Sequence, residues 1–202
     1  MYFISESHGF APNDTLITYR GQDYAIRSLF IFGAKVVHLI SENDNRYKVS
    51  LKLLFSGLPV ESKIVMGFGE IDCRSTEGIL VHCAKRNLDF HDVIDDMLLR
   101  YVLMLHEQAK NHGVEIILYG VPAPHTYQLE QFSDEQQTKF KQLIAYFNQH
   151  LMALCHQHDF TFLNVYELTQ LNNQSNLKYH TDEIHLKAET LAELFSLLTL
   201  DC

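Results

Sequence analysis

Residues 63–74 read Lys-Ile-Val-Met-Gly-Phe-Gly-Glu-Ile-Asp-Cys-Arg, and this stretch says most about the fold. Its first half, Lys63–Phe68, is an apolar run without the alternation of a strand that has one face in water. Such runs are typical of strands buried on both faces in a parallel sheet. Gly67 and Gly69 bound the run, and three charged residues follow them. The stretch predicts a buried strand that ends where a ligand can approach the backbone.

Further apolar runs and amphipathic segments alternate along the chain on both sides of this strand. The other expected strands are about Tyr2–Ser5, Ser28–Phe32, Glu115–Tyr119 and about Thr161–Val165. The expected helices are His91 to about Asn111, a long helix opening at Ser133, and about Lys187–Leu200. This alternation predicts an α/β fold: a doubly wound three-layer sandwich, flavodoxin-like, with a central five-stranded parallel sheet. No repeat or Pro/Gly/Ser-rich linker divides the chain, so residues 1–202 are expected to form one domain.

Helix boundary signals support these assignments. Gly113 follows the first helix, where a left-handed residue commonly ends one. Ser133 and Gln136 have the spacing of a capping box. Apolar residues then recur at three- and four-residue steps, which predicts that one face of each helix packs on the sheet.

Composition limits the partners that we expect. The chain has 202 residues, 47% hydrophobic and 20% charged, with a formal net charge of −9. A surface of that sign repels nucleic acid and anionic membranes, so neither is an expected partner. The N-terminus does not resemble a signal peptide, which predicts a cytoplasmic protein. Four scattered cysteines, without metal-binding or disulfide spacing, are expected to be free thiols; they are Cys73, Cys83, Cys155 and Cys202. No cofactor is expected.

Three short segments contain candidate catalytic or binding residues, and the first is Ser5–Gly9, directly after the first strand. A serine in such a turn presents its hydroxyl at the sheet edge, where backbone N–H groups can face an oxyanion. The alternative is that Ser5 or Ser7 only caps a helix.

The second segment is Gly69–Arg74, in which Glu70, Asp72 and Arg74 place three charges at the predicted edge of the site. A solvated loop with a local Asp–Arg pair is the alternative interpretation.

The third segment, His180–Leu186, precedes the last helix. Asp182 and His185 lie three residues apart, so the carboxylate can fix the imidazole tautomer and leave the other nitrogen free to accept a proton. A capping Asp182 with a surface His185 is the alternative. A metal site formed with His180 is also conceivable, but no fourth ligand is evident nearby.

In order and spacing, these segments resemble the SGNH hydrolases, also called GDSL-like lipases and acylhydrolases. The family's Gly-Asp-Ser, lone Gly, Gly-x-Asn-Asp and Asp-x-x-His motifs correspond to residues 5–7, Gly33, residues 69–72 and residues 182–185. The Gly-Glu-Ile-Asp-Cys-Arg string and the Ser7-His8 pair after the first strand resemble a divergent bacterial subgroup with polysaccharide-related members. The resemblance implies that Ser7 is the nucleophile and that Asp182 and His185 are the acid and the base. It also implies that the N–H groups of Ser7 and Gly33 bind the oxyanion.

Two departures from the family pattern affect the expected chemistry. Ser5 and Glu6 replace the leading Gly and Asp. The family's Asn, which donates to the oxyanion, falls on Ile71, which cannot donate. Loss of one such donor costs about 10²- to 10³-fold in rate unless another group, such as Arg74, replaces it.

The resemblance implies a serine esterase that forms an acyl-enzyme on Ser7, and the expected substrate is an O-acetyl group on a saccharide or another small ester. An O-acyltransferase that uses the same triad is the second interpretation. A catalytically degenerate carbohydrate-binding or scaffold domain is the third, and it is favoured by Ile71 and the altered Ser5-Glu6 pair.

Overall fold

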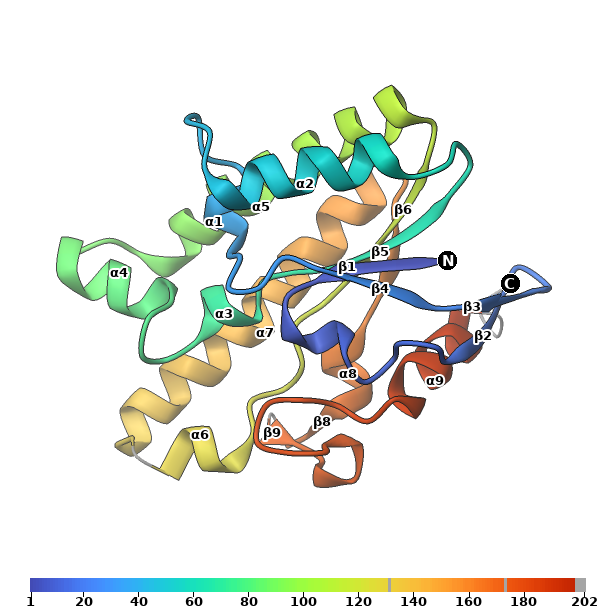
Figure 1. The fold of residues 1–202 in the computed structure, drawn as a ribbon. Helices are drawn as coiled ribbons and strands as arrows, with labels where there is room; N and C mark the ends of the chain where they lie inside the picture. The colour runs from blue at the N-terminus through green and yellow to red at the C-terminus, as the bar shows by residue number, and fades with distance from the viewer. Residues whose placement is uncertain (131, 173, 199–202) are drawn as a thin grey trace.

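In the computed structural model, which describes residues 1–130, 132–172 and 174–198, five parallel strands form the central sheet (Figure 1). Their order is β4-β1-β5-β6-β7. The strands are β1 (Tyr2–Ser5), β4 (Arg27–Phe30), β5 (Lys63–Gly67), β6 (Glu115–Tyr119) and β7 (Thr161–Leu163). The predicted α/β fold with a five-stranded parallel sheet is confirmed, and each strand lies within two residues of its expected bounds.

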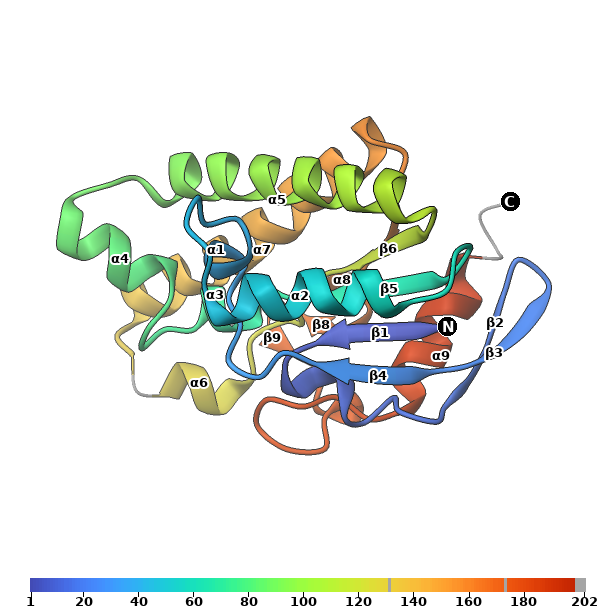
Figure 2. The ribbon, with the colours of Figure 1, turned by 45° about the horizontal axis from the view of Figure 1, so that its top comes forward.

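Both faces of the sheet are covered, as expected for strands without polar alternation (Figure 2). On one face, Ile4, Met66 and Leu118 pack against α2 (Arg46–Gly57), α5 (Phe90–His112) and α7 (Asp134–Gln157). On the other face, the neighbouring residues of the same strands, such as Phe3 and Val65, pack against α9 (Glu189–Leu198). The result is three layers with the sheet in the middle.

The long helices begin and end close to the predicted residues. Helix α5 ends at Gly113, whose φ is 61°. At the start of α7, the Ser133 hydroxyl accepts the Gln136 N–H at 3.4 Å, and the Gln136 side chain accepts the Ser133 N–H at 3.0 Å. The predicted capping box is therefore present. Helix α9 begins at Glu189, two residues later than expected, and Leu200 lies outside the described residues.

An antiparallel hairpin, β2 (Leu16–Tyr19) and β3 (Gln22–Ala25), was not expected from the sequence. Its turn residues Arg20 and Gly21 both have positive φ, as in the turns that join two-residue hairpins. Side chains of the hairpin, including Tyr19, pack against α9. The remaining elements are α1 (Val36–Leu39), α3 (Glu70–Cys73), α4 (Ile79–Arg86), α6 (Thr126–Glu130), α8 (Val165–Thr169), β8 (Gln170–Leu171), β9 (Gln174–Ser175) and the 3-10 helices η1 (Ser7–Gly9) and η2 (Leu177–Tyr179).

The adjacent carboxyl ends of β1 and β5 position the candidate site. Ser5, the last residue of β1, pairs with Gly67 at the end of β5. After β1, the chain first adds β4 on one side of β1 and then adds β5 on its other side. The carboxyl ends of β1 and β5 therefore form the topological switch point, where doubly wound folds bind ligands. The segments after these two strands, η1 and α3, therefore lie next to each other.

The sequence also led to predictions about the cysteines and about membranes. Cys73, Cys83 and Cys155 are buried free thiols, as predicted, and Cys202 lies outside the described residues. Over the part of the chain that the structure describes, no helix has both the length and the hydrophobicity needed to cross a bilayer.

Candidate active site

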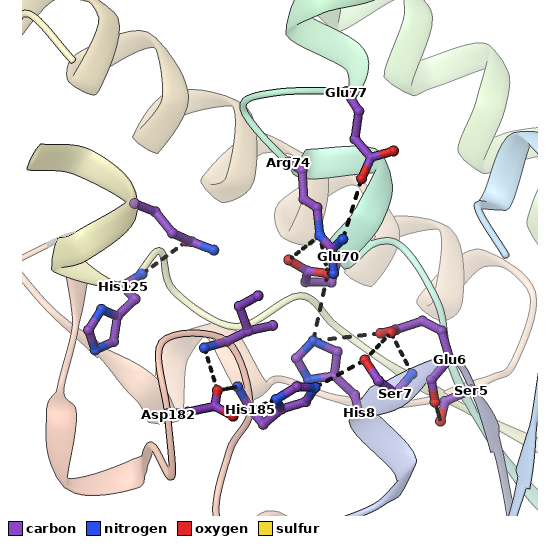
Figure 3. A network of polar contacts seen from close by, with 12 residues as sticks. Ser5, Glu6, Ser7, His8, Glu70, Arg74, Glu77, His125, Asp182 and His185 are labelled. Atoms are coloured by element: carbon purple, nitrogen blue, oxygen red, sulfur yellow. Dashed lines mark hydrogen bonds and ion pairs between the residues drawn. The ribbon is translucent and has the colours of Figure 1, made fainter. Parts of the chain in front are cut away.

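Ser7 opens the 3-10 turn η1 immediately after β1, where Glu6 holds it through two hydrogen bonds (Figure 3). One oxygen of the Glu6 carboxylate, Oε2, accepts the Ser7 N–H at 2.5 Å and the Ser7 hydroxyl at 2.7 Å. This carboxylate caps the turn, so its role is partly structural. The Ser7 N–H, expected to face an oxyanion, is therefore already paired with an anion.

His185 approaches Ser7 from the other end of the chain. Its Nε2 lies 3.0 Å from the Ser7 Oγ, although the two residues are 178 positions apart. Its Nδ1 lies 2.8 Å from the Asp182 Oδ2. The structure thus joins the three residues in the order Asp182–His185–Ser7. This is the geometry of a nucleophile, a base and the group that orients the base.

The turn before α9 fixes Asp182 as well as His185. Asp182 Oδ1 accepts the N–H groups of Ile184 at 2.8 Å and His185 at 2.7 Å. Burial acts to raise the pKa of Asp182, but these bonds and the His185 ring outweigh it and lower the pKa to about 2. The carboxylate therefore stays charged at neutral pH and can hold an N–H on Nδ1, which leaves Nε2 free to accept a proton.

His8, which the sequence analysis noted only as part of the Ser7-His8 pair and gave no role, lies beside these three residues. It is 8% exposed, and its ring centroid is 5.4 Å from that of His185. Its Nε2 is 3.6 Å from Glu6 Oε1 and 3.8 Å from Glu70 Oε2. Burial acts to lower the pKa of His8, but the carboxylates of Glu70 and Glu6 outweigh it and raise the pKa.

Glu70 is held from its other side by Arg74. The Arg74 Nε lies 3.1 and 3.0 Å from the two Glu70 oxygens, and its Nη2 lies 2.8 Å from Oε2. Burial acts to raise the pKa of Glu70, but His8 and Arg74 outweigh it and lower the pKa. Glu77 and Lys35 extend the ion pairs to the surface. Glu70 and Arg74 thus lie near the site, as predicted, but their charges are already paired with each other.

Asp72 does not lie at the site edge, and this prediction is corrected. Its side chain is 2% exposed, and its Oδ2 accepts the Val36 N–H at 2.7 Å, at the start of α1. The single turn of α3 directs this side chain into the protein, whereas Glu70 faces His8. Burial raises the pKa of Asp72 to about 7. Asp72 therefore has a structural role as a buried helix cap.

The raised pKa of Asp72 predicts how stability changes with pH. Its folded-state pKa lies above its ordinary value of 3.8, so the protonated form favours folding. That contribution is complete below pH 4, falls as the pH rises and is lost above pH 7. The asparagine in Asp72→Asn stays neutral at every pH. Relative to wild type, the free energy of unfolding of this variant should therefore increase by about 1–4 kcal/mol between pH 4 and pH 8. Urea unfolding of both proteins across this range measures the difference, and a difference that does not change with pH would refute it.

Gly33, Gly69 and Ile71 were predicted at the oxyanion side of the site. Gly33 lies in the exposed turn after β4 with a φ of 71°, and within the described residues no hydrogen bond joins its N–H to the site. Gly69 precedes α3 with a φ of 125°, and a Cβ there would lie 2.6 Å from the Phe147 ring. Ile71 is 6% exposed, so it only packs. The side chain of Ile71 therefore provides no amide donor for an oxyanion, as the sequence indicated.

A narrow pocket, with a cavity volume of about 20 Å³, adjoins the turn that holds His185. Ile184 and the Glu70–Arg74 pair line it, together with apolar side chains such as Val121. His180 also lines it. A cavity of this volume holds about one water molecule, so a larger group could bind only at the open mouth of the pocket.

His180 does not join Asp182 and His185 in a cluster of metal ligands. Both of its ring nitrogens are buried without a hydrogen-bond partner in the described residues, and its ring packs against His125 at 5.1 Å. Burial lowers the pKa of His180 to about 4, so this ring is neutral. The potential metal ligands that do gather, within the described parts of the chain, are Glu6, His8 and Glu70.

Comparison with known proteins identifies the fold. No family model matches the chain, and neither does any curated protein. Solved structures do match. A Slackia heliotrinireducens protein assigned to the SGNH hydrolases has a TM-score of 0.58 at 12% identity, over 99% of this chain and 96% of that one. A GDSL-like lipase from Bacteroides thetaiotaomicron has a TM-score of 0.55 at 16% identity, over 99% and 85% of the two chains.

An acetylxylan esterase from Geobacillus stearothermophilus has a TM-score of 0.55 at 14% identity, over 96% of this chain and 90% of that one. At such low identity, these likenesses establish the fold. The chain has the fold of the SGNH hydrolases, as its motifs predicted.

Proposed function

We propose that this chain, with its SGNH-hydrolase fold, is a serine esterase that cleaves short acyl esters through Ser7, His185 and Asp182. One observation carries the proposal: the hydrogen-bonded series from Asp182 through His185 to the Ser7 hydroxyl, with distances of 2.8 and 3.0 Å. A base within this distance of a serine, and itself oriented by a carboxylate, is the arrangement that activates a hydroxyl.

The proposed reaction has two halves. In the first, Ser7 Oγ bonds to the ester carbonyl carbon while its proton passes to His185 Nε2. The carbonyl electron pair moves onto oxygen and then returns to expel the alcohol, which takes the proton from His185. In the second half, water gives a proton to His185 and cleaves the acyl-enzyme in the same way. Proton transfer by such a base contributes about 10²- to 10⁴-fold.

A short acyl group on a saccharide is the substrate class that we favour. The pocket beside the His185 turn is small, and its wall is partly polar. Acetylxylan esterases are among the proteins that share the fold. We therefore expect acetyl esters to be cleaved in preference to long-chain esters.

The substrate proposal is tested by comparing p-nitrophenyl acetate, p-nitrophenyl palmitate and acetylated xylo-oligosaccharides as substrates. Saturable release of acetate from the first and third, with little turnover of the palmitate, is the expected result. Repeating the assay with a sugar acceptor separates transfer to water from transfer to a hydroxyl, which would indicate an acyltransferase. If no ester is turned over, the esterase proposal fails.

A non-catalytic carbohydrate-binding or scaffold domain is the second candidate, and one observation favours it. The Ser7 N–H is paired with Glu6, and Ile71 offers no amide, so two expected oxyanion donors are not available. Binding of an acetylated oligosaccharide without its hydrolysis would support this candidate.

A further inference from the structure

A negative charge lies beside the proposed nucleophile, where it opposes the proposed chemistry. Glu6 Oε2 is 2.7 Å from the Ser7 Oγ. Acyl transfer builds a second negative charge on the substrate oxygen, close to the same Oγ. Two like charges at such distances repel strongly where water is scarce. An anion must therefore form next to a carboxylate, at a position where Ile71 cannot supply the expected amide.

The carboxylate also competes with the proposed base for the serine proton. The Ser7 hydroxyl has one proton and lies near two acceptors, Glu6 Oε2 at 2.7 Å and His185 Nε2 at 3.0 Å. Only the bond to His185 leads to proton transfer in the proposed reaction. Any group that weakens Glu6 as a hydrogen-bond acceptor would favour the hydrogen bond from the Ser7 hydroxyl to His185.

His8 lies where it can reduce both the repulsion of the oxyanion by Glu6 and the competition of Glu6 for the Ser7 proton (Figure 3). Its Nε2 faces the second oxygen of Glu6 at 3.6 Å and Glu70 at 3.8 Å, and its ring lies against that of His185. Glu6 Oε1 and His8 Nε2 are both buried, and neither has a hydrogen-bond partner within the described residues. Arg74 fixes Glu70 from the far side, so the ring is confined between two anchored carboxylates.

We propose that His8 is a further functional residue of this site: its imidazolium offsets the charge of Glu6, so that the oxyanion can form beside Ser7. This inference rests on the proposed esterase function. His8 keeps its proton throughout, while the transferred proton moves only between Ser7, His185 and the leaving oxygen. His8 is thus a charge-compensating residue that acts through Glu6 and forms no bond to substrate.

The surrounding charges support an imidazolium at this position. The charged and titratable groups that face His8 are Glu6 from the segment after β1, Glu70 and Arg74 from α3 and its C-terminal end, and His185 from the turn before α9. The two carboxylates raise the pKa of His8 despite its burial. Glu6, His8 and Glu70 could also hold a metal ion. However, Arg74 already binds both oxygens of Glu70, which favours a proton over a metal.

A double-mutant cycle tests the inference. His8→Gln should lower kcat/KM for p-nitrophenyl acetate about 10²- to 10³-fold, because the uncompensated charge of Glu6 then opposes the oxyanion about as strongly as the loss of an oxyanion donor would. In a Glu6→Gln background, where there is no charge to offset, the same substitution should cost less than about tenfold. An equal cost in both backgrounds, or no cost in either, would overturn the inference.

The protonation of His8 can be measured without activity, which keeps the inference testable if a variant fails to fold. In a side-chain NMR titration of wild type with EDTA, His8 should be charged at pH 7. A neutral His8 at that pH, or its stoichiometric capture by added Zn²⁺ in place of the proton, would overturn the inference. If Ser7→Ala keeps full activity, the esterase proposal itself fails. If only His8→Gln keeps it, the role of His8 alone fails.

Discussion

Replacing Ser7 with alanine is expected to lower kcat/KM for acetyl esters by about 10³- to 10⁶-fold, the range seen when a serine nucleophile is removed. The reason is that the Ser7 Oγ, 3.0 Å from His185, is the atom that would bond to the acyl carbon. Initial rates with p-nitrophenyl acetate, compared with wild type from the same preparation, measure the effect.

Ser50→Ala provides the matched control, because it removes a serine hydroxyl that only bonds the Arg46 carbonyl on the surface of α2. We expect its rate to stay within twofold of wild type. Circular dichroism and thermal melting show whether both variants are folded. A folded Ser7→Ala protein with more than a tenth of the wild-type rate would exclude Ser7 as the nucleophile.

Asp182→Asn is expected to lower kcat by about 10⁴-fold without unfolding the protein. The asparagine oxygen can still accept the N–H groups of Ile184 and His185. Its amide, however, would face His185 Nδ1 as a donor and force the proton onto Nε2. A ring with a proton on Nε2 cannot accept one from Ser7.

The matching control is Asp159→Asn, an exposed residue with a φ of 57°, a conformation that asparagine also tolerates. It should leave kcat unchanged. Measuring kcat and KM separately is informative, because the proposed role predicts a loss in kcat with little change in KM. A loss confined to KM would instead indicate that Asp182 binds substrate.

Much of the fold could be predicted because the sheet is buried on both faces. Its three central strands, β1, β5 and β6, are short runs with little polar character, and the long helices α5 and α7 have clear apolar stripes. The start of α7 was also predictable, because Ser133 and Gln136 form a capping box through local hydrogen bonds alone.

The hairpin and the short helices depended on tertiary contacts that no local pattern reveals. Within residues 16–25 only Ile17 and Tyr19 are buried, and they pack against α9 from the other end of the chain. Helix α2 has a good cap in Asn45, but its buried residues Leu51 and Phe55 form only a sparse stripe. Local propensity alone therefore gave no clear signal for these elements.

The candidate site could be predicted in part. Ser7, Asp182 and His185 follow from motif order, since each motif lies at an end of an element that reaches the same sheet edge. The inward direction of Asp72 could not be predicted, because it depends on how the single turn of α3 leaves β5. The role that we propose for His8 could not be predicted either, because its partner Glu70 lies 62 positions away in the sequence.

Covalent labelling with a fluorophosphonate, followed by mass mapping of peptides, directly tests whether Ser7 is a nucleophile activated by His185. We expect one adduct per chain, on Ser7 in the N-terminal peptide, with labelling slowed greatly in His185→Ala and absent in Ser7→Ala. An adduct on another residue, or ester turnover by a protein that never labels at Ser7, would contradict this role of Ser7.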